Sequence, residues 1–163
     1  VVSNGDLMIG REPGPQAFDL GGVAKAVQDD VAALGREGLG NALPDAAMTV
    51  AVLAAFCQGE TRITNVANLR LKETDRLRAL ATELRKLGVQ VAEFSDGLQI
   101  NGHPEALHGA EIATYDDHRM AMCFGMAGAR LPGIRIQEPG CVAKTYPGFW
   151  EDLQGVGGHV QQV

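Results

Sequence analysis

The stretch from Asn68 to Gly88 constrains the fold most, because it joins a cluster of charges to an amphipathic helix. Its second half repeats leucine at the spacing of one helical face, at Leu77, Leu80, Leu84 and Leu87. Residues spaced at i, i+3, i+7 and i+10 form a single apolar stripe. The spacing therefore predicts a helix over Lys72–Leu87 that ends at Gly88.

The first half of this stretch is highly charged. Five ionisable residues fall within seven positions: Arg70, Lys72, Glu73, Asp75 and Arg76. If the helix begins near Glu73, then Lys72 and Arg76 are four residues apart and lie on one face, and Glu73 lies three residues before Arg76 on the same side. A helix N-terminus adds free N–H groups and partial positive charge, so the pattern predicts an anion site containing one carboxylate. The alternative is a solvated, salt-bridged helix start, which charge pattern alone favours.

Size and charge narrow the function classes. A chain of 163 residues that is 45% hydrophobic is long enough for one domain or two small repeated units. The formal net charge of −6 argues against nucleic-acid binding, which requires a basic surface. Residues 70–86 nevertheless hold six cations against three acids. We therefore expect an anionic small-molecule ligand there.

Several features favour a cytoplasmic protein. Cys57, Cys123 and Cys141 are widely spaced, which is typical of reduced thiols and not of a disulfide framework or a CxxC metal site. No apolar run reaches membrane-spanning length, and no secretory signal opens the chain. The first residue is Val1 and not methionine, which suggests a processed product or a piece of a longer protein.

The remaining pattern alternates helices and strands, so we expect an α/β chain with helices packed on sheets. We expect a variable segment over 1–40, the main α/β portion over 41–154 and a flexible, glycine-rich tail over 155–163. Strands are predicted at Asp6–Gly10, Thr61–Val66, Val89–Phe94, Leu98–Ile100, Glu111–Thr114 and Ile134–Gln137. Further helices are predicted from Asp45 to Gly59, from Asp117 to Arg130 and over Pro147–Leu153, with a weak helix or mobile insertion within Leu20–Gly40.

Charged residues recur at or just before the starts of helices, in four places. The four runs are Pro44–Thr49, Lys72–Arg76, Tyr115–Met120 and Gly140–Thr145. If the βα units stack side by side, these runs converge on one rim. Arginine suits phosphate and carboxylate through paired hydrogen bonds, while lysine supplies a point charge. Taken singly each run is weak, because Asp45 and Asp117 are also ordinary N-cap residues and His118 is more often structural.

Two other kinds of site have no support in the sequence. No pair of histidines has metal-ligand spacing, so we expect no metal site. There is no GxGxxG motif before a helix and no P-loop, so nucleotide binding is not indicated either.

Taken together, the four runs resemble the C-terminal part of the 5-enolpyruvylshikimate-3-phosphate synthase (3-phosphoshikimate 1-carboxyvinyltransferase) family. The resemblance covers roughly Asn41–Leu153 and rests on four segments in the family's order. They read P-D-A-A-M-T from Pro44, K-E-T-D-R-L from Lys72 with E-L-R-K-L-G from Glu83, D-H-R-M-A-M from Asp117, and A-K-T-Y-P from Ala143.

The resemblance implies a fold and an activity. Members of the family are built from βαβαββ units with helices on mixed sheets, arranged as two domains with the substrates between them. They transfer the enolpyruvyl group of phosphoenolpyruvate to the 5-hydroxyl of shikimate 3-phosphate and release phosphate, a step of aromatic amino acid biosynthesis. The family uses no metal and no organic cofactor.

The resemblance also implies a role for each matched residue. Asp45 corresponds to the carboxylate that contacts the shikimate ring hydroxyls and is a candidate base, and Glu73 to the group that moves a proton at the methylene carbon. The phosphoenolpyruvate-binding cations would be Arg76, Arg119 and Lys144. Asn68 and Lys72 would contact shikimate 3-phosphate, with His118 beside the site.

The chain also departs from the family. Family enzymes are more than twice as long, and the N-terminal half that faces this part has no counterpart among these residues. Residues 11–40 do not match the family's usual connection and look longer than it. We therefore expect a partial domain of about two repeat units that is inactive by itself, with the missing N-terminal half as its partner.

Two alternatives remain open from the sequence. One is a stand-alone module, derived from this fold, that binds an anion or pairs with another chain. The other is the sister enolpyruvyl transferase of cell-wall synthesis, which shares the fold. The K-E-T-D-R and D-D-H-R-M runs favour the shikimate enzyme over this second alternative.

Overall fold

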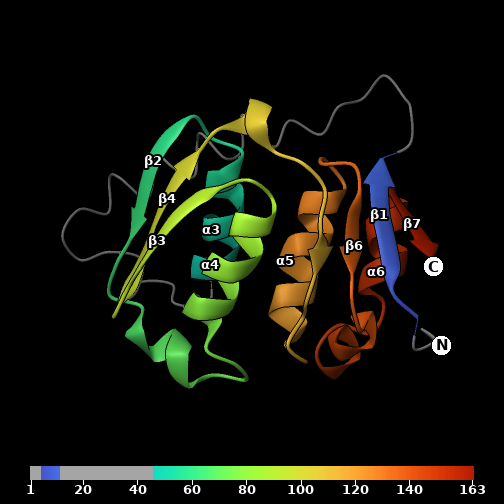
Figure 1. Cartoon of the computed structure of the whole chain (residues 1–163). Coiled ribbons are helices and arrows are strands. Elements are labelled where there is room, and N and C mark those ends of the chain that lie inside the picture. The colour runs from blue at the N-terminus through green and yellow to red at the C-terminus, as the bar shows by residue number, and fades with distance from the viewer. Residues whose placement is uncertain (1–4, 12–45) are drawn as a thin grey trace. The chain divides into compact units, whose positions relative to one another are not determined.

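The computed structural model describes residues 5–11 and 46–163, which divide into two compact units (Figure 1). One unit contains the described residues 46–107, and the other contains 5–11 together with 108–163. Each unit has its own sheet and its own helices. The mixed α/β class with helices on sheets is thereby confirmed.

The unit of residues 46–107 is an antiparallel sheet covered by two helices (Figure 1). Its elements in chain order are α3 (Ala47–Ala55), β2 (Gly59–Ile63), the 3-10 helix η3 (Ala67–Leu71), α4 (Arg76–Lys86), β3 (Gln90–Phe94), β4 (Gly97–Gly102) and the 3-10 helix η4 (Pro104–Ala106). The strands lie in the order β2-β4-β3. Helices α3 and α4 pack against each other and against this sheet.

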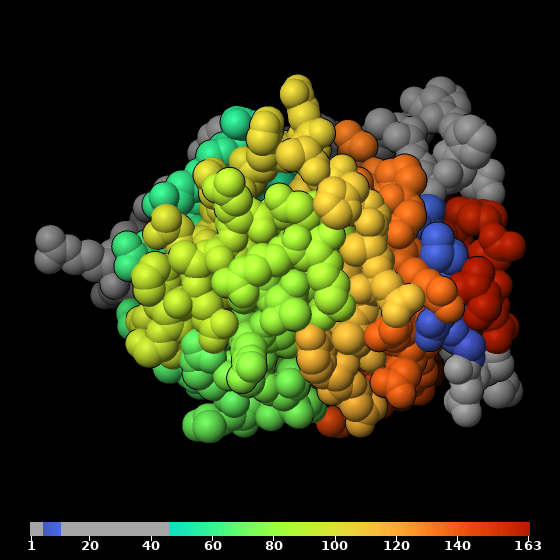
Figure 2. Space-filling model, viewed as in Figure 1, coloured from blue at the N-terminus to red at the C-terminus, as the bar shows by residue number. Residues whose placement is uncertain are grey.

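The leucine stripe fixes how α4 packs. Leu77, Leu80, Leu84 and Leu87 are all buried, so the predicted apolar face is confirmed. Burying each leucine contributes roughly 1.5–3 kcal/mol relative to leaving it exposed. In Figure 2 the light-green side chains of α4 and the neighbouring strand β3 form a continuous packed surface over this unit. The position of α4 therefore follows from its apolar face.

Close backbone approach joins α3 to β4 at Gly102. A Cβ atom at this position would lie 2.1 Å from the carbonyl oxygen of Cys57 and 2.3 Å from that of Ala54. Both are backbone atoms at the end of α3, which cannot move away as a flexible side chain could. Only glycine fits here without displacing the helix end.

The second unit is built on a mixed sheet with the strand order β5-β6-β1-β7. Its elements are β1 (Leu7–Arg11), β5 (Glu111–Ile112), α5 (His118–Gly128), β6 (Ile134–Ile136), the 3-10 helix η5 (Pro139–Lys144), α6 (Phe149–Gly155) and β7 (Gly158–Gln162). Strands β5 and β6 are parallel, whereas β1 pairs antiparallel with both β6 and β7.

Helix α5 packs closely on this sheet, and α6 packs on β7. A Cβ atom at Gly128 would lie 2.5 Å from Cβ of Ile9, so α5 reaches the strand without an intervening side chain. Trp150 of α6 lies against Gly125 of α5 and donates its indole N–H to the carbonyl oxygen of Pro139 at 3.2 Å. A buried indole of this kind needs such an acceptor.

The start of α4 differs from the prediction. The helix was expected from Lys72, but it begins at Arg76 with Asp75 as its N-cap. The Asp75 carboxylate accepts a hydrogen bond from the backbone N–H of Arg78 at 3.1 Å. An N-cap side chain satisfies a free N–H of the first turn, which is why the helix starts there and not at Lys72. Lys72 and Glu73 therefore lie ahead of the helix.

The C-terminal segment corrects a second expectation. Residues 155–163 were predicted as a flexible tail, but α6 extends to Gly155 and Gly158–Gln162 form β7. This strand pairs with β1 from Leu7↔Gln162 to Arg11↔Gly158. Its polar, largely exposed side chains give no alternating pattern in the sequence, so its place at the sheet edge had no signal.

Other predictions lie partly or wholly outside the described residues. The weak helix or insertion within Leu20–Gly40 and the capping role of Asp45 fall there, so they stay predictions, as do the domain limits at 40 and 154. In the described part of the chain, no helix has the length and apolar character needed to cross a membrane.

The contact at Gly102 leads to a stability prediction. Gly102→Ala should lower the free energy of unfolding by about 1–3 kcal/mol or more, because its Cβ overlaps two backbone carbonyls. Gly10→Ala is the matched control, since Gly10 also lies in a strand and a Cβ there meets nothing within 4 Å. Urea unfolding of both variants measures the difference. Equal stability of the two variants would contradict the close approach.

Candidate active site

The predicted site residues fall into two groups, one in each unit. Asn68, Lys72, Glu73 and Arg76 lie in the unit of residues 46–107. His118, Arg119 and Lys144 lie in the other. Asp45 is outside the described residues. The structure brings together members of each group as follows.

Glu73 and Arg76 form an ion pair. Nη2 of Arg76 lies 2.8 Å from Oε2 of Glu73, and the Arg76 side chain is only 2% exposed. A guanidinium keeps its charge at any pH a protein experiences, so its burial requires anionic or carbonyl partners. Glu73, which is less buried, supplies one of them. The pair places a carboxylate directly beside a buried cation, an arrangement that fits both the anion-site and the salt-bridge interpretations of this segment.

Asn68 and Lys72 are exposed in and just after η3. Lys72 directly precedes Glu73, and Asn68 lies within the 3-10 helix. Their polar groups are therefore open to a ligand that approaches this surface. An amide and an ammonium there can donate to hydroxyl or phosphate oxygens.

The charge cluster contains one residue with a different role from that expected. Arg70 belongs to the charge cluster from which the anion site was predicted, but its guanidinium donates to both carboxylate oxygens of Asp75, at 3.0 and 2.8 Å. It also bonds the carbonyl oxygens of Phe94 and Ser95 at the end of the β3 strand. Sequence reasoning missed both this set of contacts and the capping role of Asp75.

Two residues of the second group, His118 and Arg119, lie in the first turn of α5. Asp117 caps this helix, since its buried carboxylate accepts from the backbone N–H of Arg119 at 2.9 Å. His118 is 5% exposed and Arg119 is half-buried. The first turn of α5 therefore holds both side chains in fixed places, with a negative charge at the helix N-terminus where the dipole favours it.

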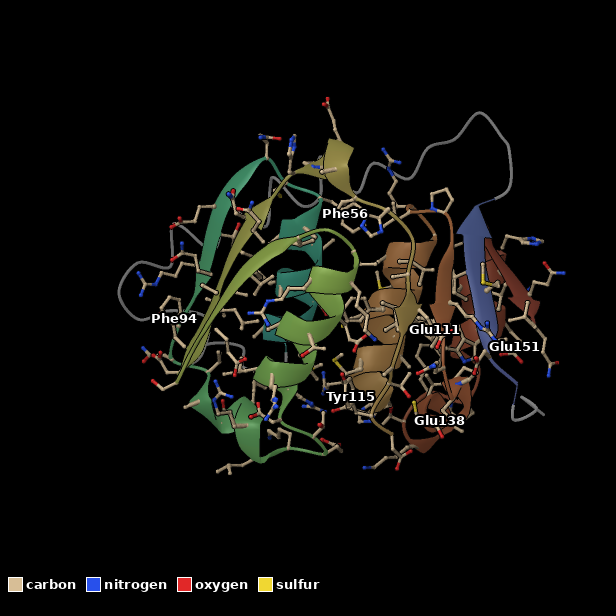
Figure 3. All side chains as sticks on the ribbon, in the orientation of Figure 1. Phe56, Phe94, Glu111, Tyr115, Glu138 and Glu151 are labelled. Carbon is tan, nitrogen blue, oxygen red and sulfur yellow. The ribbon has the colours of Figure 1, made fainter. Side chains whose placement is uncertain are left out.

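Unusual backbone angles precede this helix and η5. Tyr115 and Asp116 have φ angles of 56° and 55°, and Glu138 has 47°. Figure 3 labels Tyr115 and Glu138, one ahead of α5 and the other ahead of η5. The left-handed conformation costs a non-glycine residue about 1–2 kcal/mol. Surrounding packing must offset this cost, and such strain is frequent at functional sites.

Lys144 lies at the end of η5, which packs against α5. The lysine is exposed, but residues on both sides of it are anchored. Val142 is buried, and Tyr146 donates its hydroxyl to Oδ2 of Asp152 while its ring packs edge-on against Phe149. The Lys144 ammonium is thus carried on a well-held backbone.

Cys141 lies in the same unit, in η5. Burial raises the pKa of its thiol, and the charges of Asp116 and Asp117 raise it further. A thiol with a raised pKa stays protonated at neutral pH and is a weak nucleophile. Cys57, Cys123 and Cys141 form no disulfide bond. The raised pKa therefore gives no support to a thiolate nucleophile at Cys141.

Within residues 5–11 and 46–163, no group of three or more His, Cys, Asp or Glu side chains is placed to hold a metal ion.

Comparison with known proteins identifies the family. The family described as EPSP synthase (3-phosphoshikimate 1-carboxyvinyltransferase) matches residues 32–153. This chain belongs to the EPSP synthase family. The resemblance drawn from the four runs is thereby confirmed, and the match begins at residue 32, somewhat before Asn41.

Individual relatives agree. The 3-phosphoshikimate 1-carboxyvinyltransferase of Xenorhabdus nematophila is 52% identical over 114 residues, which are 70% of this chain and 26% of that protein. That of Thiobacillus denitrificans is 55% identical over 111 residues, 68% of this chain and 26% of the relative. The chain therefore spans about a quarter of the length of the curated relatives it matches.

Solved structures show the same fold. An EPSP synthase from Acinetobacter baumannii matches with a TM-score of 0.67 and 34% identity, covering 73% of this chain and 29% of that one. The enolpyruvyl transferase NikO from Streptomyces tendae matches with a TM-score of 0.53 and 27% identity, covering 69% and 25%. The expected enolpyruvyl transferase fold, present as a partial domain, is thereby confirmed.

The tyrosine beside Lys144 leads to a prediction about pH. The hydrogen bond to Asp152 and the charge of that carboxylate raise the pKa of Tyr146. Asp152→Asn should bring this pKa back toward the ordinary value near 10. Absorbance titration of tyrosinate in a Tyr115→Phe background measures it, because Tyr146 is then the one tyrosine of the 163 residues.

The sign of the effect on stability follows from the raised pKa. The bond needs a protonated hydroxyl, so it stabilises the fold below the unfolded-state pKa near 10. That contribution disappears as the pH rises through the raised pKa of Tyr146. An unchanged tyrosinate titration in the Asp152→Asn variant would show that the bond is not formed in solution.

Proposed function

We propose that this chain is part of an enzyme that transfers the enolpyruvyl group of phosphoenolpyruvate to the 5-hydroxyl of shikimate 3-phosphate and releases phosphate. The observation that supports it most directly is the Glu73–Arg76 pair, a carboxylate held beside a buried cation in a chain of the EPSP synthase family. Since the chain spans about a quarter of its relatives, the proposal includes a further part of the enzyme that supplies the remaining contacts.

Glu73 is the proposed proton carrier at carbon. The methylene carbon of phosphoenolpyruvate takes a proton while the 5-oxygen of shikimate 3-phosphate adds to the adjacent carbon. In the second stage a proton leaves the new methyl group, phosphate departs and the double bond forms again. Glu73 gives the first proton and removes the second. Asp45 accepts the proton of the attacking hydroxyl, and this proton leaves with the departing phosphate. Positioned carboxylates are suited to both transfers.

Each substrate is proposed to have its own set of binding residues. Arg76, Arg119 and Lys144 are proposed to bind the carboxylate and phosphate of phosphoenolpyruvate, where fixed positive charge stabilises the departing phosphate. Asn68, Lys72 and Asp45 are proposed to bind shikimate 3-phosphate, and His118 lies beside the site. The proposed reaction needs neither a metal nor an organic cofactor, and we place it in the cytoplasm.

Glu73→Ala in the complete enzyme tests the proton-transfer role. Turnover should be lost, while shikimate 3-phosphate still binds with nearly its original affinity. Glu73→Gln should also be inactive, because an amide can accept the bond from Arg76 but cannot carry the proton. Steady-state rates of both variants, together with calorimetric binding of shikimate 3-phosphate, measure the two effects.

Glu105→Ala is the matched control, since Glu105 is an exposed acid in η4 that has no proposed role. Its rate should equal that of the unaltered enzyme. If Glu73→Ala keeps its rate within about tenfold, an effect of about 1.4 kcal/mol, Glu73 does not carry the proton.

Calorimetric titration of the 163-residue chain alone separates the enzyme part from a stand-alone module. We expect weak binding of both substrates, because many of the groups that position them belong to the rest of the enzyme. A dissociation constant of about 1 μM or below for either substrate, worth about −8.2 kcal/mol, would favour the anion-binding module instead.

A further inference from the structure

Arg70 makes more polar contacts than its place in the charge cluster suggests. Its guanidinium lies in η3 and is 25% exposed. Nη1 donates to both oxygens of Asp75 and lies 2.9 Å from Oε1 of Glu93. Nε donates to the carbonyl of Ser95 at 2.9 Å, and Nη2 to that of Phe94 at 2.6 Å. All three nitrogens are therefore engaged within the protein.

These contacts close a loop. The Arg70–Asp75 pair joins the two ends of a six-residue segment whose middle contains Lys72 and Glu73. Asp75 is also the N-cap of α4 through the backbone N–H of Arg78. One carboxylate thus connects the arginine to the first turn of the helix that carries Arg76.

The same arginine ties this loop to the sheet. Phe94, which Figure 3 labels, is the last residue of β3, and Ser95 follows it in the turn to β4. The chain just before η3 is fastened to the same turn, because Val66 donates its backbone N–H to the carbonyl of Asp96 at 2.9 Å and Asn65 donates to the Asp96 carboxylate at 3.2 Å. The segment that carries Lys72 and Glu73 is therefore held by hydrogen bonds on both sides, through Asn65, Val66 and Arg70 before these residues and through Asp75 after them.

Arg70 is poorly suited to bind an anionic substrate. Two carboxylates, those of Asp75 and Glu93, already lie against it and offset its charge. Burial lowers the pKa of Arg70, but the bonds and charges of those two acids outweigh this and raise it overall. A substrate phosphate would have to displace the bonds that Arg70 makes to carboxylate and carbonyl oxygens of the fold.

We propose that Arg70 is a positioning residue, which closes the Arg70–Asp75 loop on the β3–β4 turn and thereby holds Lys72 and Glu73 in their working places. This inference rests on the proposed function for its effect on turnover. Holding reacting groups in place is a large part of catalysis, and a displacement of about 1 Å can cost about 100-fold in rate.

Arg70→Ala in the complete enzyme should lower kcat by about 10- to 100-fold. The KM values should change less, because Arg70 does not touch the substrates. Arg70→Lys should restore little of the rate, since one ammonium cannot make the forked bonds to Asp75 and to two carbonyls. Amide hydrogen exchange should become faster at residues 71–75 and at Arg78.

Arg85→Ala is the matched control. Arg85 lies at the other end of α4 and also uses its guanidinium to bond a β3 carbonyl, that of Val91, at 2.7 and 3.3 Å. It has no contact with the Lys72–Glu73 loop among these bonds. This variant should keep kcat within about twofold and leave exchange at residues 71–75 unchanged.

Three results would overturn the proposal. One is a rise in KM with unchanged kcat in Arg70→Ala, which would make Arg70 a substrate ligand. Another is an equal loss of kcat in Arg70→Ala and Arg85→Ala, which would indicate general destabilisation. The third is unchanged exchange at residues 71–75 in Arg70→Ala. Exchange does not depend on the reaction, so it tests the loop even if the enzyme proves to have another activity.

Discussion

Burial of the α4 leucines is the interaction on which the unit of residues 46–107 depends. The stripe from Leu77 to Leu87 packs α4 against the sheet along the length of the helix. This packing fixes the position of the N-terminal end of α4. There Arg76 is buried with Glu73 against it. A buried permanent charge is costly, and the hydrophobic energy of the same helix offsets that cost. Packing and the charged site are therefore two consequences of one amphipathic segment.

In both units, an aspartate N-cap precedes an arginine in the first turn of a helix. Asp75 caps α4 and Asp117 caps α5, and in each case the cap precedes an arginine of the proposed site. The carboxylate of the cap satisfies the helix end, while the arginine side chain extends from the first turn. The capping bonds fix the backbone, which limits the conformational freedom lost when a ligand binds. A charged side chain on a rigid backbone therefore loses little conformational entropy when it binds an anion.

The sequence predicted those parts of the structure that depend on local periodicity. The leucine spacing gives α4, and Ser95-Asp96-Gly97 marks the turn between β3 and β4. The exact helix start was not predictable from charge, since Glu73 and Asp75 are both acidic residues near a helix and only the bond to Arg78 distinguishes them. The loop role of Arg70 depends on Phe94 and Ser95, more than 20 residues away, and local pattern carries no information about such a contact.

Other features were hidden for different reasons. Tyrosine is not a residue that usually adopts positive φ, so nothing in the sequence marks the left-handed turn at Tyr115 before α5. The motifs that resemble the family predict site roles for the neighbouring His118 and Arg119, and these roles stay predictions. Fold class and family were thus accessible from the sequence, whereas caps, strained turns and long-range bonds were not.

The pairing of β1 has a consequence for biosynthesis. This strand lies between β6 and β7, and its Ile9 pairs with Ile134 on one side and Val160 on the other. At a translation rate of about 5–20 residues per second, β1 leaves the ribosome roughly 6 to 30 seconds before its partners exist. The unit of residues 46–107 is complete much earlier, because its strands are close in sequence. The growing chain must therefore keep an apolar strand unpaired while another unit folds, and this interval is when it is most exposed to aggregation or to assistance by chaperones.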